Sequence, residues 1–202
     1  DGDRSIALGE GSYVWLFGDT FVGSYDEAHR RRPLASAMPH STVAKQTCAG
    51  QGCGDWQFFF ATNDTTGRPK SLIAPESSGE GYPDSGRLHE WVCNGVALRG
   101  AQRQDDRLLL TAGVLNVTGS GSWDFKMTQN NAIVVENPLE DPRDWRMASH
   151  RMPWRYGTWI VPFVCSGAAF ATVDDAWVCW LGTNNTLARI QLTDVVGPAT
   201  PD

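Results

Sequence analysis

The feature that most constrains the fold is a series of short runs of β-branched and aromatic residues, patterned with period two and closed by turn residues. The run Tyr13-Val14-Trp15-Leu16-Phe17 precedes Gly18-Asp19, which is typical of a strand that ends in a turn. Gly, Asn, Asp or Pro closes the other runs in the same way. Further strands are therefore predicted at residues 41–46, 56–61, 95–99, 107–115, 131–136, 168–173, 176–182 and 187–192.

Long helices are absent from this pattern, so we predict an all-β fold. Only Tyr25–Arg32 offers a helical run, and Pro33 ends it. The runs at 168–192 are separated by short turns and predict an antiparallel meander. No stretch of low complexity divides the chain, so residues 1–202 are expected to form a single domain.

The length of the chain is compatible with a β-propeller. A sandwich uses about seven strands in ~100 residues, whereas a propeller uses antiparallel four-stranded blades of roughly 40 to 50 residues each. The 202 residues would then supply between about four and five blades. No strict internal repeat is visible, so this arithmetic allows a propeller without requiring one.

Charge and hydropathy exclude two classes of partner. The formal net charge is -6, and Arg30–Arg32 is the one basic cluster, so a nucleic-acid partner is not expected. No run approaches the roughly 18 apolar residues of a membrane span. The start, Asp1-Gly2-Asp3-Arg4, resembles neither a signal peptide nor an initiator Met, so we expect a processed or excised chain.

The cysteines favour disulfides over a metal site. Cys48 and Cys53 enclose a Gly-rich loop whose ends are expected to meet in a disulfide, and Cys165 and Cys179 flank a predicted hairpin as a second pair. Cys93 remains, either as a buried thiol or as an intermolecular partner. The nearest approach to zinc-ligand spacing, between His89 and Cys93, has no second pair behind it, so no metal is predicted.

Three sequons point to the same environment as the disulfides. Asn63, Asn116 and Asn184 each fit the pattern of an N-glycosylation site. Together with the predicted disulfides, they favour an extracellular or cell-surface protein.

Two aspartates near the start of the chain form the densest chemical signal. Asp19 ends its strand 18 positions after Asp1, and a hairpin with its turn near residues 9–11 would bring both carboxylates to one end of adjacent strands. Paired carboxylates are the groups that hydrolyse glycosidic bonds, where their separation sets retention or inversion. The alternative is that Asp19 forms an Asx-type turn, in which the carboxylate bonds its own backbone.

The same residues carry a family resemblance. Asp1-Gly2-x-x-Ser5, followed by Trp15-Leu16-Phe17-Gly18-Asp19-Thr20-Phe21, resembles the opening motif of a family of secreted five-bladed β-propellers long described as a domain of unknown function. Members of that family are glycoside hydrolases that cut D-arabinan. The motif match covers residues 1–23, and looser matches follow at residues 39–44, 90–91 and 188–190.

The resemblance implies a site, and this sequence differs from the family pattern in two ways. It assigns the two family aspartates to Asp1 and Asp19, and it implies a polysaccharide substrate with no cofactor. A complete five-bladed ring needs roughly 300 residues, so we expect an incomplete ring here, or one completed by another chain or by self-assembly. An α-amino group on Asp1 would favour its carboxylate form, which suits a base better than an acid.

A third group with acid–base chemistry is Glu90, between His89 and Trp91. An indole in a partly dry pocket can raise a carboxyl pKa to the range of a general acid, and His89 is placed to tune the same site. The alternative for Glu90 is a solvent-facing strand residue. His40 is a candidate substrate ligand beside Ser41, or else a surface or hydrogen-bonded residue.

Nine tryptophans are many for this length and favour a carbohydrate ligand, because aromatic rings stack on the apolar faces of sugars. Most are expected in the core. Trp91, Trp154 and Trp159 lie beside polar or turn residues and are the stacking candidates, and Arg155 is positioned to hydrogen-bond sugar hydroxyls.

Two functions remain open at this level. The first is an extracellular glycoside hydrolase acting on furanose-containing polysaccharide of the arabinan type, through Asp1 and Asp19 with Glu90 as an acid. The second is a non-catalytic secreted glycoprotein that serves as a carbohydrate-binding, structural or filament module. A propeller hosts both roles, so the fold by itself does not separate them.

Overall fold

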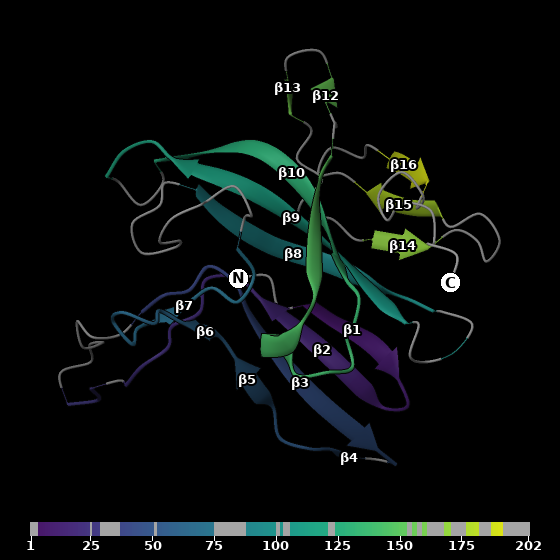
Figure 1. Ribbon diagram of the computed structural model, residues 1–202, viewed down its shortest axis with the longest axis horizontal. Coiled ribbons are helices and arrows are strands. Elements are labelled where there is room, and N and C mark those ends of the chain that lie inside the picture. Colours follow the sequence, from purple (N-terminus) through teal and green to yellow (C-terminus); the bar gives the residue numbers. More distant parts are fainter. Residues whose placement is uncertain are drawn as a thin grey trace.

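The computed structural model is all-β, with its strands in antiparallel sheets (Figure 1). It describes residues 4–24, 26–28, 37–50, 52–74, 88–99, 102, 106–120, 124–152, 155–156, 159–160, 168–170, 177–181 and 187–191. Within these residues, no helix is long and apolar enough to cross a bilayer.

The N-terminal sheet is built on a meander whose strands follow each other in order along the chain. Its strands are β1 (Arg4–Gly9), β2 (Ser12–Phe17), β3 (Thr42–Ala49), β4 (Gly52–Cys53) and β5 (Gln57–Phe59). The order is β1-β2-β3-β4, and β5 also pairs with β3. In β2, Val14 and Leu16 are fully buried while Trp15 between them is only half-buried, as the period-two pattern predicts.

The turn between β1 and β2 lies where the sequence predicts it. Gly9, Glu10 and Gly11 all have positive φ, at 91°, 49° and 73°. Gly11 is required for a second reason, since a Cβ there would lie 1.8 Å from the carbonyl oxygen of Cys48. The turn therefore fixes the register of the hairpin, in which Arg4 pairs with Leu16.

The central sheet is a four-stranded meander of longer strands. It contains β8 (Leu88–Leu98), β9 (Arg107–Val117), β10 (Phe125–Val135) and β11 (Met147–Met152), in the order β11-β10-β9-β8. In β9 every residue from Leu108 to Leu115 is buried, so both faces of this sheet are covered.

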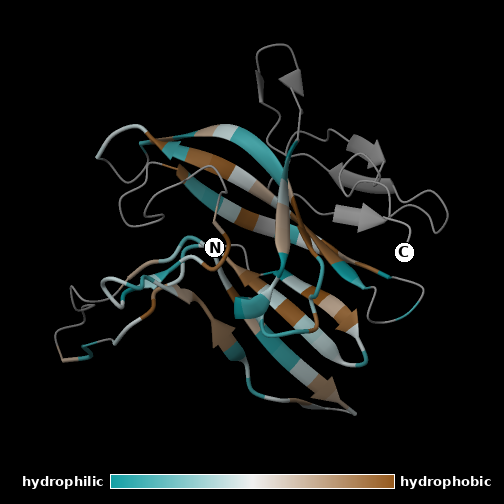
Figure 2. Ribbon diagram, viewed as in Figure 1, coloured by the Kyte–Doolittle hydropathy of each residue, from teal (hydrophilic) through white to brown (hydrophobic). Residues whose placement is uncertain are grey.

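The core lies between the N-terminal and central sheets. Ile6, Leu8 and Leu16 from the first pack in one cluster with Leu110 and Ile133 from the second. Figure 2 shows hydrophobic residues banded along the strands of both sheets. The loop before β11, which contains the 3₁₀ turn η3 (Pro142–Asp144), joins the sheets as well, because the Lys45 ammonium donates to the carbonyl oxygen of Leu139 at 2.7 Å.

Shorter strands complete the described structure. They are β6 (Ala61–Thr62), β7 (Pro69–Lys70), β12 (Arg155–Tyr156), β13 (Trp159–Ile160), β14 (Ala168–Phe170), β15 (Trp177–Leu181) and β16 (Leu187–Gln191). The sheet β14-β15-β16 confirms the meander predicted at 168–192, and β14 lies beside β8.

The all-β prediction is thus confirmed, with antiparallel meanders in sequence order. A closed propeller is not identified, so that finer architecture stays a prediction. The predicted helical run at Tyr25–Arg32 lies largely outside the described residues.

Candidate functional site

A hydrogen-bonded pair of side chains at the end of the N-terminal sheet forms the centre of the candidate site. Asp19 follows the end of β2, and His40 precedes β3, the strand that pairs with β2. Nδ1 of His40 donates to Oδ1 of Asp19 at 2.7 Å, and the two side chains are 26% and 39% exposed respectively. The Asp19 carboxylate therefore bonds a side chain of the neighbouring segment.

Hydrogen bonds to a neighbouring segment hold His40 in place. Its backbone N–H donates to Oγ of Ser71 at 2.9 Å. The next residue, Ser41, is buried and donates its hydroxyl to the carbonyl oxygen of Ile73 at 2.8 Å. These bonds fix the backbone that carries the imidazole, which gives the Asp19–His40 pair a defined geometry.

Thr20 fixes the other side of the pair. Its backbone N–H donates to the carbonyl oxygen of Pro39 at 3.0 Å, and its hydroxyl donates to the carbonyl oxygen of Gly18 at 2.8 Å. The hydroxyls of Thr20 and Thr42 also lie 2.8 Å apart. The chain on either side of Asp19 is thereby tied to the start of β3.

His89 joins the pair from the central sheet. It lies on β8, and its ring centroid is 3.9 Å from that of His40. The pKa of His89 is lowered from 6.5 to about 4, chiefly by burial and next by the neighbouring His40, while Asp19 opposes both effects. His89 is therefore a neutral imidazole at pH 7, packed against the ring that orients Asp19. Sequence reasoning placed His89 near Glu90 but did not pair it with His40.

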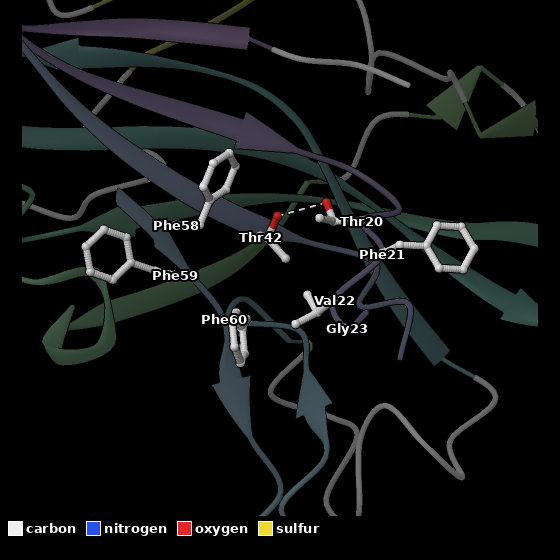
Figure 3. Close-up of a pocket in the computed structure, with 8 residues that line it drawn as sticks. All are labelled: Thr20, Phe21, Val22, Gly23, Thr42, Phe58, Phe59 and Phe60. Carbon is white, nitrogen blue, oxygen red and sulfur yellow. Dashed lines mark hydrogen bonds between the residues drawn. The ribbon is translucent and has the colours of Figure 1, made fainter. Parts of the chain in front are cut away.

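A pocket of about 370 Å³ begins directly beside Asp19 in the chain. Figure 3 shows its lining, in which the bonded hydroxyls of Thr20 and Thr42 contrast with aromatic rings. The lining residues are Thr20, Phe21, Val22, Gly23, Thr42, Phe58, Phe59 and Phe60. The pocket is thus lined mainly by apolar side chains, and its Thr20 is the residue that follows Asp19 in the chain.

Aromatic rings continue from this pocket along the N-terminal sheet. Trp15 and Trp56 are stacked with centroids 4.8 Å apart, and Phe17 lies 5.7 Å from Trp56 and 5.5 Å from Phe58. Trp56 and Phe58 are 39% and 53% exposed. We call Trp15, Phe17, Trp56 and Phe58 the aromatic strip. Sequence reasoning missed it, because a period-two pattern gives the face of a strand but not what covers that face.

Glu90 does not face solvent, which was the alternative considered for it from the sequence. Its side chain is fully buried, so the solvent-facing interpretation was wrong. Nδ2 of Asn131 donates to its Oε1 at 2.7 Å, and Glu90 lines a cavity of about 130 Å³ together with Ile133 and Ser149. Since successive strand residues alternate, Glu90 and His89 lie on opposite faces of β8.

The other predicted site residues are placed as follows. Trp91 is half-buried and meets Phe125 edge to face at 6.4 Å. Asp1 and Trp154 lie outside the described residues, and Arg155 and Trp159 are described only as backbone in β12 and β13.

The predicted Cys48–Cys53 disulfide is present. Cys165 lies outside the described residues, and Cys179 is described only as backbone in β15. Across the described ranges, no group of three or more His, Cys, Asp or Glu side chains is arranged to hold a metal ion.

Comparison with known proteins assigns the chain to a family. Residues 1–197 match the family described as "Domain of unknown function (DUF5005)", so the chain belongs to that family. None of the curated proteins matches its sequence. The family description leaves the function open, so the arguments for it rest on the site.

Proposed function

We propose that the protein is an extracellular glycoside hydrolase that acts on furanose-containing polysaccharide of the arabinan type. The observation that carries the proposal is the partly exposed Asp19 carboxylate, oriented by His40 and followed in the chain by Thr20, which lines an aromatic pocket. Asp19 is also the residue onto which the resemblance to arabinan-cutting propellers carries a catalytic aspartate. The finer architecture proposed is a propeller of four-stranded antiparallel blades of the five-bladed type.

Asp19 is suited to act as base or nucleophile. Its Oδ1 accepts a hydrogen bond from His40, while within the described part of the chain no bond engages Oδ2. A carboxylate held at one oxygen and open at the other can attack an anomeric carbon or deprotonate a water. His40 is then a positioning residue that fixes the direction of attack.

A second carboxyl group must protonate the leaving oxygen, and two residues compete for that role. Arg4 pairs with Leu16 in the β1–β2 hairpin. In the sequence, Asp1 precedes Arg4 by three positions, and Asp19 follows Leu16 by three positions. Glu90 is fully buried beside Asn131 and a small cavity, on the face of β8 opposite to His89, so an acid role for Glu90 would need the substrate to reach that face. Asp1→Asn and Glu90→Gln variants separate the two roles.

The aromatic lining supplies a binding mode for a sugar chain. Ring faces stack on the C–H faces of sugars, and the pocket is lined by Phe58, Phe59 and Phe60. The exposed Trp56 and Phe58 extend this surface beyond the pocket. A polymer lying along the aromatic strip would present one linkage near Asp19.

The test is product release from D-arabinan, L-arabinan and fructan. Wild-type protein is compared with Asp19→Asn and with Asp144→Asn, an exposed aspartate on η3 that serves as the matched control. We expect Asp19→Asn to lower the rate by about 10²- to 10⁴-fold and Asp144→Asn to leave it unchanged. Equal release by wild type and folded Asp19→Asn would contradict the proposal.

A second function, a non-catalytic binding or structural module, is favoured by one observation. The aromatic strip exposes rings on a sheet face, and exposed apolar surface of this kind marks interaction sites. If wild type releases no sugar but binds polysaccharide, and Trp56→Ala weakens that binding, the module is the better description. Mass photometry of the same samples tests the further alternatives of self-assembly and of propeller completion by another chain.

A further inference from the structure

The two hydroxyls that line the pocket at the start of β3 spend their protons within the protein. The Thr20 hydroxyl donates its one proton to the carbonyl oxygen of Gly18 at 2.8 Å. In the 2.8 Å contact between the hydroxyls of Thr20 and Thr42, the donor is therefore Thr42. Figure 3 shows these two oxygens directed at each other. Neither threonine has a proton left to donate to a ligand in the pocket.

The backbone of Val22, which also lines the pocket, is hydrogen-bonded internally as well. Its N–H donates to the carbonyl oxygen of Ala37 at 2.9 Å, and its carbonyl oxygen accepts from the N–H of Ala37 at 3.1 Å. The side chains of Val22, Phe58 and Phe60 belong to the same lining and carry no polar atom. What this part of the lining offers a ligand is hydrocarbon surface.

A bare sugar matches this lining poorly, whereas an aromatic ring matches it well. A sugar hydroxyl buried against these groups would lose its bonds to water without receiving a bond from Thr20 or Thr42. An apolar ring gains by leaving water and by contacting aromatic side chains. The volume is sufficient, since the pocket holds about 370 Å³ and an apolar cavity of about 150 Å³ already takes up benzene.

We propose that this pocket binds an aromatic acyl group, carried by the polysaccharide as an ester on a sugar hydroxyl. The inference rests on the proposed function for the sugar part of the ligand, and it names the substrate class as an acylated polysaccharide. The pocket and the aromatic strip are continuous, because Phe58 belongs to both. A sugar chain stacked on the strip would thus place a substituent in the pocket, whose Thr20 follows Asp19 in the chain.

The test is equilibrium binding of three probes to the full chain: methyl α-D-arabinofuranoside, its 5-O-benzoyl ester and methyl benzoate. The two sugars differ only in the aromatic acyl group, and the Asp19→Asn variant is used so that neither is consumed. Methyl benzoate has no glycosidic bond and is measured with wild type as well. We expect the ester to bind about 10-fold more tightly than the bare sugar, as the burial of one aromatic ring implies, and methyl benzoate to compete with the ester.

A matched pair of valine substitutions locates the ring. Val22→Thr places a hydroxyl in the pocket lining at nearly constant volume, and Val117→Thr makes the same change at a half-buried valine on β9, outside the lining. We expect Val22→Thr to lower the preference for the ester by about 3- to 10-fold, and Val117→Thr to retain it. Trp56→Ala, on the aromatic strip, should weaken the binding of both sugars by the same factor.

The three probes separate the pocket from the proposed function. Binding of methyl benzoate that Val22→Thr weakens, with no binding of the bare sugar, would support the pocket and count against the sugar-binding function. Equal affinities for the bare sugar and its ester would overturn the pocket proposal, and so would a preference that Val22→Thr leaves intact. The comparison of the probes needs no substitution in the pocket, so it decides the matter even where Val22→Thr does not fold.

Discussion

The buried imidazole of His89 makes the stability of the protein depend on pH in a predictable direction. Its pKa falls from 6.5 to about 4 on folding, chiefly because burial disfavours the imidazolium. Between these two values the unfolded chain binds more protons than the native protein does. The free energy of unfolding therefore decreases as pH falls from about 6.5 to about 4, and this contribution is constant outside that window.

The size of this effect follows from the same pKa change. The difference between 6.5 and about 4 would correspond to roughly 3 kcal/mol, at about 1.4 kcal/mol for each pH unit. His89 is only half-buried, and solvent screening reduces the effect, so we expect about 1 to 2 kcal/mol. Other groups titrate in this range as well, so the contribution of His89 is measured as a difference between two proteins.

The assay is urea unfolding followed by tryptophan fluorescence, at about pH 7 and at about pH 4, for wild type and for His89→Gln. A glutamine carries no titrating group, so wild type should lose about 1 to 2 kcal/mol more stability than the variant on acidification. Equal losses in the two proteins would show that burial does not disfavour the charged form of His89. The packing of His89 against His40 would then need another explanation.

Two further sets of substitutions test the packing of the sheets and the Cys48–Cys53 disulfide. Gly95→Ala places a Cβ 2.6 Å from Leu110 Cδ2 and 2.8 Å from Ile6 Cδ1, so overpacking should lower the free energy of unfolding by about 1 to 3 kcal/mol in urea titrations. Replacing Cys48 and Cys53 together with Ser opens a short loop, and the loop-entropy relation gives a loss of about 2 kcal/mol, measurable as a lower thermal midpoint. Unchanged stability in either variant would contradict the packing or the loop argument respectively.

Much of the fold was predictable because strand signals are local. The alternation in Tyr13–Phe17 and the glycines at 9 and 11 predicted a hairpin, and β1 and β2 form it. The meander at 168–192 and the Cys48–Cys53 bridge were predicted for the same reason. Each depends on residues that are neighbours in the chain, so period and turn chemistry determine it.

The candidate site was predicted only in part. Asp19 was identified from its motif, and His40 from its position at the start of a strand. Their hydrogen bond, and the contact of His89 with His40, join segments separated by many residues. Glu90 was weighed as a solvent-facing residue, yet it is fully buried. A strand pattern assigns a residue to a face but does not say which sheet will cover that face.

The sequence by itself thus determined the all-β class, the antiparallel hairpins, the local disulfide and the aspartate that the site is built around. Only the tertiary structure decided that His40 and His89 meet at Asp19, that Glu90 is enclosed, and that Trp56 remains exposed. The physical reason is that alternation and turn residues act over a few positions of the chain. Burial, desolvation and side-chain contacts arise when the N-terminal and central sheets pack together, and the order of residues along one strand does not encode that packing.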